Sequence, residues 1–392
     1  MEFDRVPRIA KYLSATFLLS WFGRSTVWFF LPIYFEQHIA SVFLIGIVMS
    51  LPSAIPILLD IPTGNLVQRA GEKIVIFLGL VAQIVPAALY ITAAPAILVL
   101  GKAVEGLGKV LMWNGGWSLS LRSSDESVES ESVSVFLLGV NLARIIGPII
   151  GGYLIASSGF PITFKLWMFT ASLAVLVFIG YIGVDSEKPF GRSMGELLQR
   201  KTYLDDWRHL RDNWEQMKYP FALIFLYSII FSFYWLAVPL LLKQVDAGYR
   251  VMGVIFGVAA IPKAFQFVFG DIADRFGRLK TLLVLSAGLT PVLVAMNFLS
   301  GIMVVGAAFF VARLLSSGMS PAIHAVFDEK APDELEGELT GFLEFFKHSG
   351  QALGPFVAGT VASVWSINVS FLAAGGVSIL IFVASVYGIR SQ

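Results

Sequence analysis

The sequence contains no cysteine, and Asp, Glu, Lys and Arg together make up only 14% of it. The absence of Cys excludes a disulfide framework, a thiolate nucleophile and a cysteine-ligated metal site. The shortage of charge excludes an ordinary soluble domain, in which roughly a quarter of the residues are charged. Hydrophobic residues reach 56% and include 33 Phe. This composition predicts an all-α membrane protein, because lipid cannot satisfy the open edges of a sheet.

Sequence signatures of enzymes are weak. There is no His-Glu-x-x-His pair and no nucleotide-binding glycine loop, since Gly106-Leu-Gly108 is a short match inside an apolar segment. One G-x-S-x-G match occurs, Gly191-Arg-Ser-Met-Gly195, but it lies in the polar segment between the two sets of apolar spans and not at a strand-to-helix turn. We therefore predict a protein that is not an enzyme, uses no cofactor or metal and is not driven by ATP. The formal net charge of +1 indicates no nucleic-acid partner.

Long apolar segments fill most of the chain. A spanning helix needs about 20 mainly apolar residues, and hydropathy predicts twelve such helices. The expected spans are approximately 11–34, 42–62, 74–92, 95–120, 133–158, 162–184, 219–242, 250–269, 280–299, 302–325, 340–364 and 367–388.

The two halves of the chain repeat each other. The polar, glycine-punctuated segments 64–73 and 270–280 read as copies of one loop, 206 residues apart (270 − 64). Other landmarks keep nearly the same offset: Pro32 with Pro239, Gly46 with Gly253, Gly147 with Gly354, and Gly108 with Gly318. A duplicated string of apolar segments predicts two pseudo-symmetric six-helix bundles, 1–184 and 219–392, with a substrate site between them. We expect 185–218 to be a cytoplasmic amphipathic linker or a solvated tether.

Basic residues are unevenly distributed over the predicted loops. With both termini inside, most Lys and Arg residues lie on the inner loops, and the outer ones carry Lys165, Lys243 and Arg250. The positive-inside rule then predicts a multi-pass protein of the inner or plasma membrane with both termini in the cytoplasm.

The second loop segment, Gly270-Asp-Ile-Ala-Asp-Arg-Phe-Gly-Arg278, resembles the G-x-L-a-D-r-x-G-r signature of the major facilitator superfamily. The first copy departs from that signature at Gln68, where the family prefers Asp. The resemblance implies twelve helices that rock about a central site, with these loops latching the cytoplasmic side. Alternatively, the loops only set the topology. The implied gating residues are Asp60, Gly64, Arg69, Gly71, Gly270, Asp274, Arg275, Gly277 and Arg278.

Two further segments resemble motifs of the same superfamily. Gly147-Pro148-Ile-Ile-Gly151-Gly152 in the fifth span is similar to a motif associated with antiporters, which implies export and adds these residues to the gating set. The alternative is close helix packing through small residues. Lys102-Ala-Val-Glu105-Gly106 in the fourth span resembles an Arg-x-x-Gln-Gly motif linked to proton transfer, with Glu in place of Gln.

Ionisable residues inside the spans are the strongest functional signal. Charge in lipid costs about 2.5–3.5 kcal/mol per residue on insertion scales, so these residues should face an interior cavity and pair. The proton-coupling candidates are Glu105, Lys102, Glu344 and His348, and a fixed structural ion pair is the alternative role for the two acids. Basic residues outnumber acids: Arg24, Lys102, Lys109, Arg144, Lys263, Arg313 and Lys347 against Asp60, Glu105 and Glu344.

The excess of positive charge disfavours a cationic substrate. Candidate substrate-binding residues are Arg24, Trp28, Lys109, Trp113, Asn141, Arg144, Tyr227, Tyr234, Trp235, Arg313 and Gln351. We predict a monomeric, proton-coupled exporter of a small neutral or anionic organic compound, whose partners are that molecule, protons and the bilayer. The alternatives are uptake or exchange of an organic anion, such as a phosphorylated or carboxylated metabolite, and a transporter-like receptor that does not transport.

Overall fold

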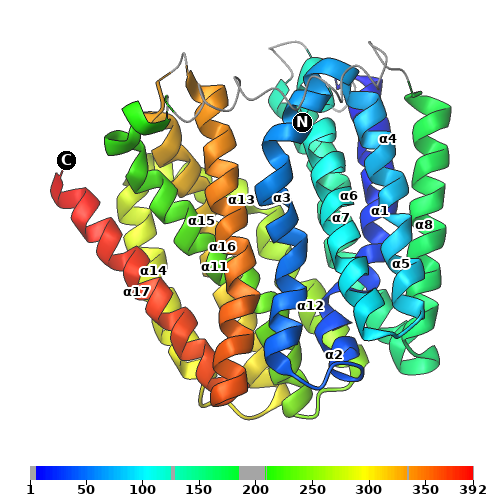
Figure 1. Ribbon diagram of the computed structural model, residues 1–392. Helices are drawn as coiled ribbons and strands as arrows, with labels where there is room; N and C mark the ends of the chain where they lie inside the picture. Colours follow the sequence, from blue (N-terminus) through cyan, green and yellow to red (C-terminus); the bar gives the residue numbers. More distant parts are fainter. Residues whose placement is uncertain (1–5, 125–128, 185–207, 209, 333–334, 392) are drawn as a thin grey trace. The chain divides into compact units, whose positions relative to one another are not determined.

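The computed structural model describes residues 6–124, 129–184, 208, 210–332 and 335–391 (Figure 1). Helices make up the described ranges, and no strand occurs in them, which confirms the predicted all-α class. The elements are α1 (Arg8–Val27), η1 (Trp28–Phe30), α2 (Leu31–Glu36), α3 (Val42–Ala70), α4 (Glu72–Ala82), α5 (Ile84–Ile91), α6 (Pro95–Arg122), α7 (Glu129–Ser158), α8 (Phe160–Tyr181), α11 (Trp214–Gln244), α12 (Tyr249–Ala264), α13 (Gln266–Phe276), α14 (Arg278–Met296), α15 (Ile302–Lys330), α16 (Glu336–Val364) and α17 (Ile367–Ser391).

The apolar helices match the predicted spans. Eight stretches of the described chain are long and apolar enough to cross a membrane, and α12 with α13, bent by 43°, makes a ninth if the pair is one span. The three other predicted spans fall on α1 with η1 and α2, on α6 and on α16, and α1, α6 and α16 carry ionisable residues. Those residues lower the hydropathy of a helix without shortening it. The fold is therefore that of a multi-pass helical membrane protein.

The repeated polar segments are mostly helical, so their prediction as loops is wrong. Helix α3 continues to Ala70 and α13 to Phe276, and the chain turns only at Gly71 (φ 93°) and Gly277 (φ 96°). Positive φ is strained for residues with a Cβ but accessible to glycine. Similarly, α11 begins at Trp214, inside the predicted linker, while residues 185–207 and 209 of that linker lie outside the described residues.

The chain forms two compact units. Unit 1 comprises residues 1–31, 58–199 and 249–257, and unit 2 comprises 32–57, 200–248 and 258–392. Within unit 1, α1 packs on α7 and α8, and α6 packs on α4 and α5. Within unit 2, α11 packs on α15, α16 and α17, and α14 packs on α15 and α17. The division into bundles 1–184 and 219–392 remains a prediction.

Helices α8, α14 and α17 expose large apolar side chains. Phe169 and Leu176 of α8 are each 66% exposed, Val284 of α14 is 65% exposed, and Val383 of α17 is 55% exposed. In water such a surface would be an aggregation hazard. In a bilayer it is the surface that contacts lipid.

Glycines allow very close helix contacts at equivalent places in the two repeats. A Cβ on Gly152 would meet the backbone of Tyr249 and, at 3.1 Å, the Cα of Gly253 in α12. A Cβ on Gly359 would meet the Cα of Gly46 at 2.9 Å. Each member of the second pair corresponds to one of the first by the same offset (359 − 152 and 253 − 46, both 207). These contacts account for the grouping of 249–257 with unit 1 and of 32–57 with unit 2.

Candidate functional site

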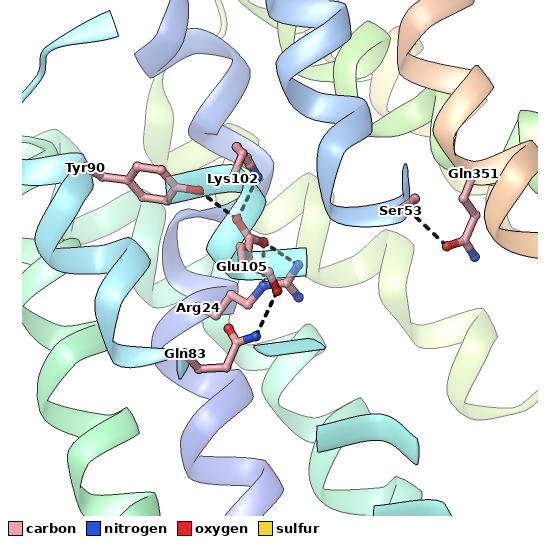
Figure 2. Close-up of polar contacts among 7 residues, drawn as sticks. All are labelled: Arg24, Ser53, Gln83, Tyr90, Lys102, Glu105 and Gln351. Carbon is pink, nitrogen blue, oxygen red and sulfur yellow. Dashed lines mark hydrogen bonds and ion pairs between the residues drawn. The ribbon is translucent and has the colours of Figure 1, made fainter. Parts of the chain in front are cut away.

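A buried polar cluster in unit 1 centres on Glu105 (Figure 2). Its Oε1 accepts hydrogen bonds from Arg24 Nε at 2.8 Å and Nη2 at 2.6 Å. Its Oε2 accepts from Lys102 Nζ and from the Tyr90 hydroxyl, both at 2.9 Å. Gln83 Nε2 donates to the Glu105 backbone carbonyl at 3.1 Å. Lys102, Glu105 and Tyr90 are fully buried, and Arg24 is 6% exposed.

Helix geometry and two glycines bring these groups together. Lys102 and Glu105 are neighbours on one face of α6 because they stand at i and i+3. A Cβ on Gly101 would lie 2.5 Å from the Tyr90 ring, and one on Gly108 would lie 2.7 Å from Gln83 Nε2. Only glycine at these two positions of α6 therefore lets the Tyr90 and Gln83 side chains approach Glu105. Neither Tyr90 nor Gln83 was among the predicted site residues, and no pattern in the sequence pointed to them.

The cluster carries net positive charge. One carboxylate is paired with two cations, so the ionised triad has a charge of +1. Burial of an unpaired charge costs several kcal/mol, and pairing with good hydrogen bonds offsets that cost. Glu105 therefore stabilises both Arg24 and Lys102, and a proton on Glu105 would weaken its interaction with each of them.

Aromatic rings and a small cavity lie beside the cluster. The Arg24 guanidinium carbon lies 4.6 Å from the centre of the Trp21 ring, and that of Arg144 lies 4.8 Å from it. The cavity has a free volume of about 10 Å³, close to the space that one water needs. Its lining residues are Ser20, Trp21, Arg24, Gln83, Lys109, Met112 and Trp113. Trp21 was not among the predicted site residues, although it precedes Arg24 by three positions.

The other predicted binding residues of unit 1 lie on the same helices. The Trp28 ring lies 5.1 Å from the Arg24 guanidinium carbon, and Trp113 packs edge-to-face on Trp21 at 6.1 Å. Asn141 is half-buried on α7, one turn before Arg144. The structure therefore gathers Arg24, Lys109, Trp113 and Arg144 around Trp21.

In unit 2, the predicted acid Glu344 pairs with Lys347 on α16. His348, the residue after Lys347, is buried, with 6% of its surface exposed. Further along α16, the Oε1 of Gln351 accepts a weak hydrogen bond from Ser53 Oγ at 3.4 Å (Figure 2). The carboxylate of Glu344 is 30% exposed, whereas that of Glu105 is fully buried. The two acids thus occupy very different environments.

A second group of predicted binding residues in unit 2 lies around Arg313 of α15. Its guanidinium carbon lies 5.0 Å from the centre of the Phe231 ring and 6.0 Å from that of Tyr234, both on α11. Tyr227, Tyr234 and Trp235 are buried along α11. The structure therefore brings Arg313 together with the predicted aromatic residues.

The second motif segment forms an ion-pair network between helices. Arg278 Nη1 donates to Glu329 Oε2 at 2.9 Å and to the Ala325 carbonyl at 2.6 Å, which links the start of α14 to the end of α15. Asp274 Oδ1 is 3.9 Å from Arg278 Nε, and Arg275 is exposed. Gly270 lies within α13, and the chain turns after that helix at Gly277 (φ 96°).

The first motif segment has a pair that sequence reasoning missed. Glu72 Oε1 accepts from Arg122 Nη1 at 2.9 Å and from Ser118 Oγ at 3.1 Å, which links the start of α4 to the end of α6. Glu72 and Arg278 stand 206 residues apart (278 − 72), and Arg122 and Glu329 stand 207 apart (329 − 122). The two repeats therefore carry the same ion pair with its charges exchanged. The repeat offset could have predicted this pair, because it relates Glu72 to Arg278 and Arg122 to Glu329.

The remaining predicted gating residues of the first half lie on α3 and α7. Asp60, Gly64 and Arg69 are on α3, and the Asp60 carbonyl accepts a weak hydrogen bond from Asn114 at 3.4 Å. Gly147, Pro148 and Gly151 are on α7. A Cβ on Gly147 would meet Ser25 at 2.5 Å, and one on Gly151 would meet the backbone of Thr26. These glycines allow α7 to pack on α1.

Known proteins share this fold and parts of this sequence. The sequence profile of the Major Facilitator Superfamily matches residues 13–347 and 221–391 of the chain. The structure is similar to that of the human organic anion transporter MFSD10, with a TM-score of 0.69 and 17% identity over 96% of this chain and 99% of that one.

Two sequence relatives match parts of the chain. An uncharacterized MFS-type transporter, YuxJ of Bacillus subtilis, is 24% identical over 259 residues, 63% of this chain and 62% of YuxJ. The multidrug resistance protein MdtG of a Rahnella species is 31% identical over 144 residues, 36% of this chain and 34% of MdtG. The chain thus matches less than two thirds of the length of either relative. Together, the helical membrane fold and the profile match show that the chain belongs to the Major Facilitator Superfamily, a family of transporters.

Proposed function

We propose that this chain is a proton-coupled secondary transporter that exports a small neutral or anionic organic compound by alternating access. The observation that carries the proposal is the fully buried Glu105 carboxylate, held by Arg24, Lys102 and Tyr90. A buried ionisable group in a membrane span is expensive and marks an ion pathway by default. The relative MdtG is named for multidrug resistance, which agrees with export.

Arg24 links the proton on Glu105 to the adjacent cavity. The ionised carboxylate holds the guanidinium with two hydrogen bonds, and a proton on Glu105 weakens both of them. A neutral compound that binds the ionised Arg24–Glu105 pair competes with the proton for that pair. Such competition between substrate and proton is the coupling that their exchange requires. Arg24 lines the water-sized cavity, so this competition requires the cavity to widen as access alternates.

Uptake or exchange of an organic anion is the second candidate. Net positive charge in the Arg24–Lys102–Glu105 triad favours it, because an acid that binds Arg24 would bind more tightly when Glu105 is protonated. Anion and proton would then move in the same direction. The solved relative MFSD10 is named as an organic anion transporter, although a likeness at 17% identity concerns the fold alone.

Flux into proteoliposomes under imposed pH gradients tests the proposal. Compounds that raise the melting temperature of the purified protein are the substrates to use, since a ligand that binds the folded state stabilises it. Export predicts that substrate and protons cross in opposite directions and that Glu105→Gln abolishes the response to the gradient. Movement of both in one direction, or exchange that ignores pH, supports the second candidate and contradicts the first.

We further propose that the protein is a monomer of the cell membrane with both termini in the cytoplasm. The segregation of Lys and Arg over the loops supports this orientation. Substrate, protons and lipid are then its partners.

A further inference from the structure

Arg313 is a buried cation that no carboxylate balances in the described parts of the chain. The residue is 9% exposed, and its Nε donates only a long hydrogen bond, 3.4 Å, to the Ala259 carbonyl. Its guanidinium otherwise packs on the Phe231 and Tyr234 rings. Ring faces attract a cation, but less strongly than a carboxylate does. In unit 1, by contrast, Arg24 and Lys102 share Glu105.

Two buried hydroxyl groups near Arg313 are poorly satisfied: that of Ser317 has no hydrogen-bond partner among the described residues, and that of Tyr234 has only the nearby Ser316 hydroxyl, which already donates to the Arg313 carbonyl at 3.3 Å. Tyr234 is 1% exposed and Ser317 is 2% exposed. Ser317 stands one turn after Arg313 on the same face of α15, and Tyr234 reaches the guanidinium from α11. A buried polar group without a partner is destabilising and calls for an explanation. A guanidinium without a carboxylate partner and two poorly satisfied hydroxyl groups thus lie close together inside unit 2.

The duplication explains why a carboxylate is missing here. The counterpart of Arg24 is Phe231 (231 − 24 = 207), which packs on Arg313 instead of supplying a second cation. The counterpart of Glu105 is Ala312 at the offset of 207, or Leu315 at the offset of 210 that relates Gly108 to Gly318. Neither residue is acidic. Among the described residues, unit 2 therefore retains a buried guanidinium without a paired carboxylate.

We infer that Arg313, Tyr234 and Ser317 form a subsite for the carboxylate or sulfonate group of an aromatic organic acid. The guanidinium can hold such a group with two parallel hydrogen bonds, and the hydroxyls can donate to its remaining lone pairs. The rings of Phe231 and Trp235, 5.5 Å apart, and of Phe309, 5.6 Å from Tyr234, suit a planar apolar body. This inference rests on the proposed function, since it names the substrate class of the transporter.

Ligand-induced stabilisation of the purified full chain tests the subsite without any gradient. The probes are benzoate, 2-naphthoate and 2-naphthalenesulfonate, with the uncharged 2-naphthamide as the matched control. We expect at least one acid to raise the melting temperature and the amide to have little effect at the same concentration. Failure of all three acids, or equal stabilisation by the amide, overturns the inference.

Variants locate the binding. Arg313→Lys keeps the charge but loses the planar fork, and Ser317→Ala removes one donor, so each should weaken binding of the acid about tenfold or more. Ser286→Ala is the matched control, because the Ser286 hydroxyl already donates to the Leu282 carbonyl at 2.7 Å. Unchanged binding in both Arg313→Lys and Ser317→Ala overturns the subsite. Because Ser317→Ala changes little volume, it keeps the test valid if Arg313→Lys does not fold.

The two proposals fail separately. Wild-type protein that binds none of the acids, yet exchanges another compound for protons, removes the subsite and keeps the export proposal. Protein that binds an acid through Arg313, yet moves nothing under a pH gradient, keeps the subsite and removes export.

Discussion

At Glu105 a single carboxylate holds two cations and a phenol, so its removal affects every member of the cluster. Glu105→Gln would leave Arg24 and Lys102 buried without a counter-charge, and breaking a buried pair in this way typically costs about 3–5 kcal/mol. We expect a lower melting temperature for the purified variant and no response of flux to a pH gradient. Glu344→Gln, at a carboxylate that is 30% exposed, should lower the melting temperature less. Equal effects of the two substitutions would contradict the central role of Glu105.

The ionisable residues of this cluster were predictable, but their arrangement was not. Lys102 and Glu105 could be paired from the sequence because helical spacing places them on one face. Arg24, Tyr90 and Gln83 reach Glu105 from α1, from α5 and from the junction of α4 and α5, and such tertiary contacts leave no periodic signal. The same limit applies to the contact of Arg144 with the Trp21 ring, because Arg144 reaches that ring from α7.

At the scale of elements, the exchanged ion pairs at the ends of α6 and α15 make a direct prediction. Arg122→Glu would place two carboxylates together and weaken the contact of α4 with α6. Adding Glu72→Arg would recreate the charge order of Arg278 and Glu329. Because the Arg122 side chain is 61% exposed, stability should change by less than about 1 kcal/mol. The initial transport rate in proteoliposomes is therefore the measurement.

We expect Arg122→Glu alone to change that rate and the double variant to restore most of it. A double variant that is no better than the single one would show that these positions depend on residue identity rather than on pairing.

Glycine contacts between helices make a second prediction at this scale. Gly152→Ala and Gly359→Ala each insert a methyl group against backbone of the facing helix, so α7 and α16 must move away from their neighbours. We expect a lower melting temperature and slower transport for both. The matched controls are Gly180→Ala and Gly376→Ala, where an added Cβ meets nothing within 4 Å. These should be neutral, or stabilising by up to about 1 kcal/mol, because Ala is the better helix former. Losses as large in the controls would contradict the role of close packing.

Element positions were largely predictable from hydropathy, whereas element ends were not. The apolar spans agree with the helices because lipid imposes both length and helical structure. The polar segments 64–73 and 270–280 continue helices instead of forming loops, because only Gly71 and Gly277 adopt positive φ. Polarity there marks the end of the apolar stretch and not the end of the helix.

At the scale of the whole molecule, the orientation of the chain in the membrane can be measured directly by cysteine labelling. The chain has no cysteine of its own, so it gives no labelling background. Phe276 and Phe298 lie just beyond opposite ends of α14 and are 70% and 74% exposed. At 1.5 Å per residue, the 19 residues of α14 extend roughly 28 Å, about the thickness of the hydrocarbon core.

Single substitutions Phe276→Cys and Phe298→Cys keep every charge, so they leave the positive-inside signal unchanged. A membrane-impermeant maleimide applied to intact cells should label Phe298→Cys at once and Phe276→Cys only after permeabilisation. The reverse pattern would place the termini outside, and labelling of both from one side would show that α14 does not cross the membrane.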